Sequence, residues 1–396
     1  MGKTLMMAKP GSTLTSGDEC NLFGYISDSA TEANTQASAT EAGTFSGLGI
    51  NINSGGSGTN TLRFRDAGAN GAQIAEIAGA GIAEDTTNND ILSAGDLFNL
   101  AYTDTGTDPV VSWIKGNVEL SSGHGCFQGS ASFNGIVCDV ASATRFLSLV
   151  GGLSADGVAV ENDAAWRVRG YDTFEALQVR ISANARNNDS IFRNRINAGN
   201  GTGVITFASG ITGLLTATGL ADAIADAQTI DVSIELGTGA QDLTVSFVLA
   251  TLKSVTSMQD VLTGSQAGVS RTGSGTAVYV PIGGHLSFTA GFTEAQARVK
   301  PGFAGQAKNL RCYLSANTYA GDGTLKLYQN GSPVITLTLA AGGGAGWYEN
   351  TADVVAFDND DEFSFEFDEG TSGSITVRAA GVTFIPPDVL MAQACM

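Results

Sequence analysis

The densest group of side chains that could do chemistry is a run of carboxylates near residue 360. Asp358, Asp360 and Asp361 lie in one short stretch between Phe357 and Phe363. Hard oxygen ligands on a loop suit Ca²⁺, so these three are candidate calcium ligands, although the run lacks the regular aspartate and glycine spacing of a calcium loop. Facing carboxylates can also cleave glycans, but neighbours on one loop seldom face each other. We expect a solvated acidic turn with no cofactor, and calcium is the alternative.

A second candidate site is the aromatic pair Trp347 and Tyr348, which follows a glycine run. Exposed on a loop, the pair would be a contact for a glycan, because aromatic rings present flat apolar faces to a sugar. The alternative is that these rings, together with Trp113 and Trp166, fill the cores of β-sandwiches. We favour the core.

Enzyme signatures are otherwise scarce. The two histidines, His124 and His285, sit in glycine-flanked stretches without a nearby nucleophile, and no phosphate-binding loop or nucleophile elbow is present. The five cysteines form no Cys-x-x-Cys pair, so we expect idle buried thiols. Cys126 and Cys138 are the pair that a hairpin could bring together. We expect a protein that is not an enzyme.

The composition of the chain argues against two classes of binding partner. The chain has 396 residues, with 39 acidic against 20 basic side chains and a net charge of −19. Proteins that bind nucleic acid neutralise phosphates with clustered Lys and Arg, and no such cluster exists here, so we expect neither nucleic acid nor an anionic membrane as partner. No window approaches the roughly 18 apolar residues of a membrane span. The start of the chain also lacks the roughly 7–15 apolar residues of a secretory signal.

The chain repeats itself three times. Each copy has a glycine-ended apolar stretch, then a glutamate, then a strand around a leucine. The landmark glutamates are Glu32, Glu161 and Glu294, and the leucines are Leu48, Leu177 and Leu310. Both sets step by 129 and then 133 residues. A catalytic residue needs no triplication, so the glutamates predict a structural role, such as capping a turn or joining two modules.

Each unit of about 130 residues shows short alternating runs of Val, Ile, Thr and Phe, with turn residues at roughly 8–12-residue spacing, which is typical of a β-sandwich. Asn330-Gly331, between two such runs, predicts a tight hairpin. We therefore predict an all-β fold of three tandem jelly-roll-like β-sandwich domains with few short helices. Two alanine-rich stretches, 72–82 and 221–227, are the helix candidates.

The predicted domain limits follow from these repeats and from Gly/Ser-rich linkers near residues 121–142 and 259–274. The expected parts are an N-terminal arm (1–17), β-sandwich module 1 (18–135), module 2 (142–265), module 3 (273–386) and a C-terminal tail (387–396). The ends fit the repeat poorly and carry apolar residues. We predict that they form arms that dock on a partner subunit, and frayed termini are the alternative. The docking residues would be Met6, Met7, Val389, Leu390 and Met391.

The stretch 309–317, followed by 321–327, resembles modules of virion structural proteins of tailed bacteriophages, namely capsid decoration proteins, head fibres and tail-associated adhesins. The strand 374–377 is similar to the closing strand of those modules. The resemblance covers one module in detail and most of the chain in style.

This resemblance implies a non-enzymatic structural protein of the virion, assembled in the host cytoplasm. The leading expectation is a capsid decoration (cement) protein that stabilises the phage head by binding the major capsid protein or other virion subunits across the shell. Self-association is also implied, and both a monomer with three similar domains and a trimer remain open. The alternative is a glycan-binding adhesin or fibre module that recognises host surface sugars, and a glycan-cleaving enzyme comes third.

Overall fold

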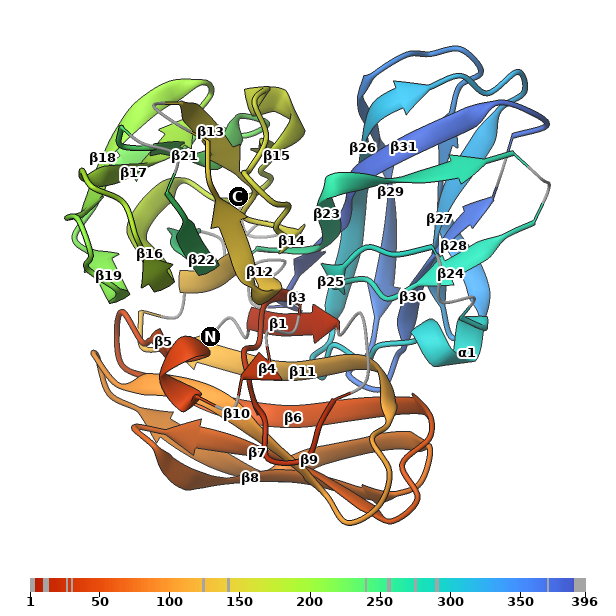
Figure 1. Ribbon diagram of the computed structural model, residues 1–396. Coiled ribbons are helices and arrows are strands. Elements are labelled where there is room, and N and C mark those ends of the chain that lie inside the picture. Colours follow the sequence, from red (N-terminus) through yellow and green to blue (C-terminus); the bar gives the residue numbers. More distant parts are fainter. Residues whose placement is uncertain are drawn as a thin grey trace.

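The computed structural model describes residues 4–9, 14–25, 28–29, 31–122, 125–140, 143–238, 241–254, 258–273, 276–288, 292–368 and 370–387. These residues form 31 strands, two 3₁₀ turns and one short helix. Figure 1 shows them gathered into three lobes around a common centre. We call residues 4–122 module 1, residues 125–254 module 2 and residues 258–387 module 3.

Each module has an inner sheet, which reaches the common centre, and an outer sheet. The inner sheet of module 1 has the order β3 (Gly24–Tyr25), β1 (Thr4–Lys9), β11 (Val110–Leu120), β6 (Gly43–Ser54), β9 (Gly81–Leu92). Its outer sheet has the order β4 (Asp28–Ser29), β2 (Glu19–Cys20), β10 (Leu97–Asp104), β7 (Thr59–Asp66), β8 (Ala69–Ala78), and β5 (Ala37–Ser38) pairs with β10.

Modules 2 and 3 repeat this arrangement, and their inner sheets are joined. The inner sheet of module 2 contains β14 (Gly151–Gly152), β12 (Gly125–Cys138), β22 (Leu243–Lys253), β16 (Thr173–Asn184), β19 (Gly213–Ala217) and β20 (Asp222–Ala223). Its outer sheet contains β13 (Thr144–Leu147), β21 (Thr229–Glu235), β17 (Ser190–Ile196), β18 (Gly199–Phe207) and β15 (Trp166–Arg167). The inner sheet of module 3 contains β25 (Gly284–His285), β23 (Gln259–Thr272), β31 (Ser374–Ile385), β26 (Gly305–Asn317) and β29 (Gly346–Phe357). Its outer sheet contains β24 (Val278–Val280), β30 (Phe363–Asp368), β27 (Gly323–Gln329) and β28 (Ser332–Leu339).

The eight main strands follow the same order in all three modules. Numbered along each module from one to eight, they run 1-8-3-6 in the inner sheet and 2-7-4-5 in the outer sheet. This is the strand order of a jelly roll, in which two four-stranded sheets face each other. The predicted all-β, jelly-roll-like sandwich is therefore confirmed. The Asn330-Gly331 hairpin is confirmed as well, since both residues have positive φ (50° and 83°) and join β27 to β28.

The predicted helices are wrong. Residues 72–82 lie in β8 and β9, and residues 221–227 contain β20 followed by a turn. Alanine favours a helix only weakly, and tertiary context overrides that preference. Here β7 pairs along most of β8 and holds it extended. The helical elements are single turns at other positions: η1 (Glu32–Asn34), η2 (Glu161–Asp163) and α1 (Glu294–Ala297).

The expected linkers are also wrong, because both segments are the first strands of modules, β12 and β23. Their glycines permit close packing. A Cβ on Gly129 would lie 2.8 Å from the Val248 carbonyl oxygen, and one on Gly264 would lie 2.8 Å from Val150 Cγ1. Cys126 and Cys138 both belong to β12, so they do not face each other across a hairpin.

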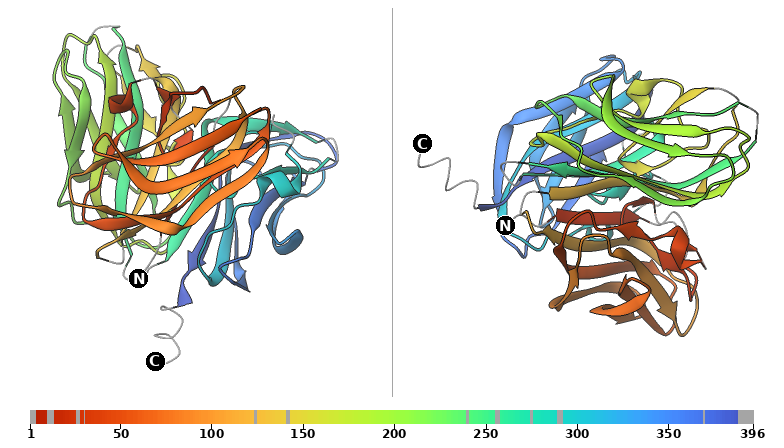
Figure 2. Two further views of the ribbon diagram at one scale, coloured as in Figure 1. Left: turned by 90° about the horizontal axis from the view of Figure 1, so that it is seen from below. Right: turned by 90° about the vertical axis from the view of Figure 1, so that its left-hand side faces the viewer.

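The three modules lie around a common centre (Figures 1 and 2), and their hydrophobic cores connect them into a ring. Each core recruits side chains from the inner sheet of another module. The core of module 1 includes Phe247 and Leu249 of module 2, and that of module 2 includes Leu262 of module 3. The core of module 3 includes Met7 and Trp113 of module 1, which completes the ring.

Ring closure explains the apolar composition of the inner strands. A sheet covered on both faces has near-continuous burial instead of alternation. In β22, residues 245–252 are all buried, and in β11 the same holds for residues 111–118. The outer strand β28 instead alternates between buried and more exposed positions over most of its length, because one of its faces meets water.

Candidate functional site: the ring centre and the module interfaces

Three short glycine-containing strands meet at the centre of the ring. β3, β14 and β25 each pair in parallel with the first strand of their own module, and β14 also pairs with β23 of module 3. The approach is too close for side chains: a Cβ on Gly24 would lie 2.0 Å from the Gly151 oxygen, and one on Gly151 would lie 1.8 Å from the Gly264 oxygen. This contact therefore explains the glycine at the end of the apolar stretch in modules 1 and 2, which is Gly24 and Gly151. In module 3 the residue equivalent to Gly24 is Gly284, one position after Gly283, the glycine expected from the sequence.

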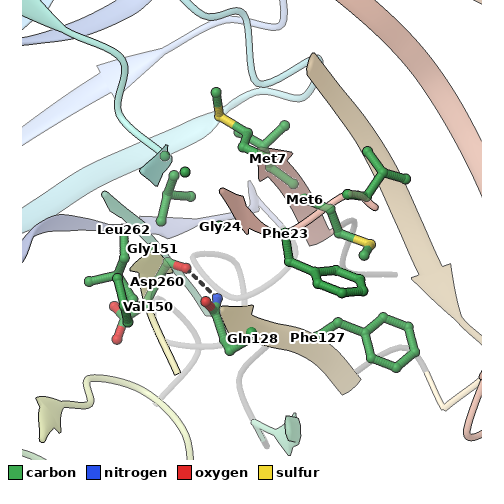
Figure 3. A pocket seen from close by; sticks show the side chains of 16 residues that line it. Met6, Met7, Phe23, Gly24, Phe127, Gln128, Val150, Gly151, Asp260 and Leu262 are labelled. Carbon is green, nitrogen blue, oxygen red and sulfur yellow. Dashed lines mark hydrogen bonds between the residues drawn. The ribbon is translucent and has the colours of Figure 1, made fainter. Parts of the chain in front are cut away.

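A small cavity of about 30 Å³ lies among these strands, and Figure 3 shows that residues of all three modules line it. Met6 and Met7 come from module 1, Phe127 and Gln128 from module 2, and Leu262 from module 3. Gln128 Nε2 donates a hydrogen bond of 2.8 Å to the backbone oxygen of Asp260, which joins modules 2 and 3. Ligand pockets usually measure about 300–1,000 Å³, so this cavity is part of the packing.

The three repeated glutamates each begin a helical turn and each bind an arginine. Glu32 Oε1 accepts from Arg65 Nε at 2.8 Å, and Glu161 Oε1 accepts from Arg195 Nε at 2.8 Å. In module 3 the partner is different: Glu294 Oε2 accepts from Arg298 Nε at 2.7 Å, four residues along the chain. In modules 1 and 2 the ion pair ties the turn to the outer sheet, since Arg65 and Arg195 lie in β7 and β17.

The same turns carry contacts between modules. The α1 turn of module 3 accepts a hydrogen bond of 3.0 Å at the Gln296 oxygen from Asn51 Nδ2 of module 1. In the η2 turn of module 2, Asp163 forms an ion pair of 3.2 Å with Arg378 of module 3, and η1 of module 1 lies against β16 of module 2. The glutamates thus hold their turns through ion pairs, whereas the contacts between modules come from other residues of the same turns.

At the interface of modules 1 and 2, one glutamine pairs with a backbone edge. Gln178 Oε1 accepts from the Ser38 N–H at 2.9 Å, and Gln178 Nε2 donates to the Ser38 oxygen at 2.7 Å. Because Gln178 is buried, water cannot reach its amide, and Ser38 supplies the hydrogen-bond partner for both polar atoms. The Gln178 side chain thus makes the two backbone hydrogen bonds that a neighbouring strand would otherwise make with Ser38.

The interface of modules 2 and 3 contains a fully buried ion pair. Arg311 Nη2 lies 2.6 Å from Asp260 Oδ2, and both side chains have zero exposure. Burial raises the pKa of Asp260, whereas the Arg311 guanidinium and hydrogen bonds from Thr383 and from the Arg169 N–H oppose that rise. Arg311 Nε also donates to the Arg167 oxygen at 3.2 Å. Asp260 and Arg311 both belong to module 3, and backbone groups of Arg169 and Arg167 in module 2 bind them, so the desolvated charge pair joins the two modules.

The interface of modules 3 and 1 is built around a buried lysine. Lys115 Nζ donates to the backbone oxygen of Lys300 at 2.6 Å and forms an ion pair with Glu84 Oε1 at 2.7 Å. Burial lowers the pKa of Lys115, and the Glu84 carboxylate opposes this effect. Beside it, Trp113 Nε1 donates to the Arg298 oxygen at 3.0 Å.

A polar groove of about 330 Å³ opens at this last interface. It is large enough for a small ligand, and this makes it the candidate binding site. Its lining comes from β6, β9 and β11 of module 1 and from two loops of module 3. These residues are Ser46, Gly47, Glu84, Thr86, Asn89, Lys115, Asn117, Lys300, Gly302, Asn359 and Asp360. Sequence reasoning missed this site, because its residues are scattered over 315 positions and form no local motif.

The acidic run of module 3 forms a turn. The Asp361 carboxylate accepts hydrogen bonds from the Asp358 N–H at 2.7 Å and from Gln329 Nε2 at 2.6 Å. Burial would raise the pKa of Asp361, but these bonds and one from Asn330 outweigh it and lower the pKa. Asp360 points elsewhere, 3.6 Å from Lys300 Nζ. Among the described residues no group of three or more Asp, Glu, His or Cys side chains is arranged to hold a metal.

The aromatic pair does not form an exposed platform. Trp347 packs beside the core of module 2, 5.3 Å from the Tyr313 ring and 5.5 Å from the Arg167 guanidinium. Tyr348 packs beside the core of its own module, and its hydroxyl donates to the Gly344 oxygen at 3.0 Å. Both lie in β29, where neighbouring side chains point to opposite faces.

The predicted N-terminal docking residues lie inside the molecule. Met6 and Met7 belong to β1 and are 3% and 6% exposed. They are apolar because β1 lies in a sheet that is covered on both faces, and not because a partner subunit covers them. Val389, Leu390 and Met391 lie outside the described residues.

Buried thiols are also placed by the structure. Cys20, Cys138 and Cys312 are buried. Burial raises the pKa of Cys138 to about 12 and also raises the pKa of Cys312. Thiols of this kind are poor nucleophiles at neutral pH. No helix in the described part of the chain is long and apolar enough to cross a membrane.

No family model and no curated protein matches this sequence. Among solved structures, the chain is similar to a protein of Sulfolobus turreted icosahedral virus (14% identity, 87% of this chain and 79% of that chain, TM-score 0.18). It is also similar to VP2 of infectious bursal disease virus (8%, 99% and 78%, 0.23) and to the insecticidal delta-endotoxin Cry8Ea1 of Bacillus thuringiensis (8%, 64% and 60%, 0.19). Scores this low mean that the backbones do not superpose over the whole chain, so these similarities carry no argument about function.

Proposed function

We propose that this chain is a non-enzymatic structural protein of a virus particle, and specifically a capsid decoration protein that binds across subunits of the shell. The observation that carries the proposal is the closed ring of three jelly-roll modules within one polypeptide. A ring of this kind has the shape of a trimer, although it is a single chain. It suits a position where three neighbouring subunits of a shell meet.

The ring gives such a protein two physical advantages. Three linked modules can contact three neighbouring sites at once, and linking raises the effective concentration of the second and third contacts. The inner sheets are buried by contacts within the chain, so the surfaces that can bind a partner are those of the outer sheets and loops. We propose the major capsid protein or other virion subunits as those partners, one copy of this chain as the binding unit, and the virion as its location.

The absence of an enzymatic role is part of the same proposal. The central cavity is too small for a substrate, and the groove at the interface of modules 3 and 1 pairs its carboxylates with lysines. Two carboxylates that face each other across a sugar are what glycan hydrolysis requires. The net charge of −19 supports partners other than nucleic acid.

The test is quantitative mass spectrometry of purified particles, combined with light scattering of the isolated chain. Hundreds of copies per particle, in a simple ratio to the major shell protein, with a monomer of 40.4 kDa in solution, are the expected results. Three to a few dozen copies would favour a fibre or adhesin at special positions instead. Absence from particles would refute the virion role.

A further inference from the structure

We propose that the polar groove at the interface of modules 3 and 1 binds a neutral sugar unit. Two irregularities of one sheet create the groove. The β6–β9 pairing shifts between Ser46 and Leu48, and the β6–β11 pairing shifts between Lys115 and Asn117. Gly47 of β6 is passed over in both pairings, and its φ of 63° is one that an ordinary side chain rarely adopts. Bulges of this kind often lie beside binding sites, where they redirect side chains.

The bulges place an unsatisfied amide at the groove. Asn117 is 3% exposed, lines the groove, and has its Oδ1 atom buried without a hydrogen-bond partner. A Cβ on Gly47 would lie 2.7 Å from Asn117 Nδ2, and one on Gly302 would lie 3.3 Å away. Because neither glycine has a side chain, the amide keeps this position between the two modules. Buried polar atoms in native structures usually have a hydrogen-bond partner, and a ligand hydroxyl or a water in the groove would supply one to Asn117.

The charges around the amide are balanced. Lys115 is paired with Glu84 at 2.7 Å, and Lys300 faces Asp360 at 3.6 Å. An inorganic anion such as sulfate would face both carboxylates and has no hydrogen to donate to Asn117 Oδ1. A metal cation would face two ammonium groups. The groove therefore favours a ligand without net charge.

The remaining groups identify the class of ligand. Ser46, Thr86, Asn89 and Asn359 surround the groove with hydroxyls and amides, each of which donates and accepts hydrogen bonds. A sugar hydroxyl also does both, so it satisfies the Asn117 amide in either orientation of its oxygen and nitrogen. A volume of about 330 Å³ lies at the lower end of the range for small-ligand sites, which suits one sugar unit better than a long oligosaccharide.

This inference goes beyond the proposed virion role and does not depend on it. A decoration protein with such a groove would also contact glycans, and a protein outside a virion could use the same groove.

The experiment is saturation-transfer NMR on the full chain with methyl glycosides of glucose, galactose, mannose and N-acetylglucosamine, each at millimolar concentration. We expect transfer to at least one glycoside. Thr86→Trp places a ring in the groove from an exposed position of β9 and should abolish the transfer. Asn117→Ala removes the amide and should weaken binding about tenfold, which is the loss of roughly one hydrogen bond.

The matched control is Thr206→Trp, because Thr206 is also an exposed threonine of a strand but lies in β18 of module 2. It should bind like the unaltered protein. Circular dichroism and melting temperature establish that each variant is folded, and Thr86→Trp keeps the test decisive if Asn117→Ala does not fold. Transfer to none of the glycosides would overturn the proposal. So would undiminished transfer in Thr86→Trp, or displacement of the glycoside by sulfate.

Discussion

The interface of modules 2 and 3 and the interface of modules 3 and 1 are built from equivalent strands but differ in their chemistry. In module 3, Leu310 is followed by Arg311, which reaches Asp260 and leaves no exposed surface on either side chain. In module 1 the equivalent Leu48 is followed by Gly49, and Lys115 from the neighbouring strand β11 makes the contact between modules. The result is a dry contact at one interface and a groove at the other.

The difference teaches what one side chain decides within a repeated fold. The large side chain of Arg311 is fully buried together with its counter-ion. Gly49 at the equivalent place leaves room for the Lys115 side chain, since a Cβ on Gly49 would lie 3.0 Å from Lys115 Cε, and the ion pair there keeps access to water, since Glu84 is 17% exposed. Losing the cation should therefore cost far more at the first interface than at the second, because water can reach the remaining carboxylate only at the second.

The largest effect is expected for Arg311→Met. The variant leaves Asp260 buried without its counter-ion, and removing one partner of a buried pair costs about 3–5 kcal/mol. Urea unfolding followed by tryptophan fluorescence measures the loss in free energy of unfolding. The double variant Arg311→Met with Asp260→Leu removes both charges and should recover much of the loss. A loss below about 1 kcal/mol in the single variant would show that water reaches Asp260.

Lys115→Met should cost less, about 2 kcal/mol, since it removes a hydrogen bond to the Lys300 oxygen but leaves a carboxylate that water can solvate. The same unfolding measurement applies. Glu84→Gln is the matched change on the other side of the pair, and it should cost at least as much, because it takes the carboxylate from a lysine side chain that is only 3% exposed. If Lys115→Met lowered the free energy of unfolding as much as Arg311→Met does, the two interfaces would not differ in their sensitivity to the loss of a cation.

The interface of modules 1 and 2 should be less sensitive than either of these, because its contact is uncharged. Gln178→Ala removes two hydrogen bonds to the Ser38 backbone, and we expect a loss of about 1–2 kcal/mol. Gln178→Glu keeps the acceptor but loses the donor, and it places a charge against the Ser38 oxygen. A larger loss for the glutamate than for the alanine would confirm that both bonds are made. Equal, negligible losses would argue against them.

The smallest effect concerns pH and Asp85, which lies in β9 next to the groove residue Glu84. Burial would raise the pKa of Asp85, but hydrogen bonds from the Asn88 side chain and from the Ile74, Asn88 and Thr87 backbone hold it well below its ordinary value. A carboxyl with a lowered folded pKa contributes stability that is present above its unfolded pKa and is lost as the pH falls. Between pH 5 and pH 3 the protein should lose about 1 kcal/mol more than Asp85→Asn does. Parallel pH profiles for the two proteins would contradict this assignment.

Much of the fold was predictable because its signals are local. Alternation in strands such as β27 and β28 predicts a sandwich, and Asn330-Gly331 predicts its tight turn, since strand and turn preferences act over a few residues. Trp113 and Trp166, both 1% exposed, follow the expectation that large aromatic residues fill cores. The spacing of Glu32, Glu161 and Glu294 revealed the repeat and its structural role.

The candidate site was not predictable, because local patterns do not encode contacts between distant segments. The glycines of β12 and β23 permit close packing, although a Gly/Ser-rich segment in a sequence is typical of a flexible linker. Met6 and Met7 resemble an exposed apolar arm in the sequence, because nothing within the first residues shows that Met6 packs in the core of module 1 and Met7 in that of module 3. The groove depends on a meeting of Asn117 with Gly302, 185 positions apart.

The sequence by itself determined that this protein is built of jelly-roll-like sandwiches with a repeated glutamate turn, because period-two burial and turn chemistry are short-range properties. Only the tertiary structure decided that the modules close into a ring, that one interface is dry while another is open, and that the first strand is core. Those outcomes follow from which faces of distant sheets bury each other, and the free energy of that burial belongs to the pair of surfaces and not to either segment alone.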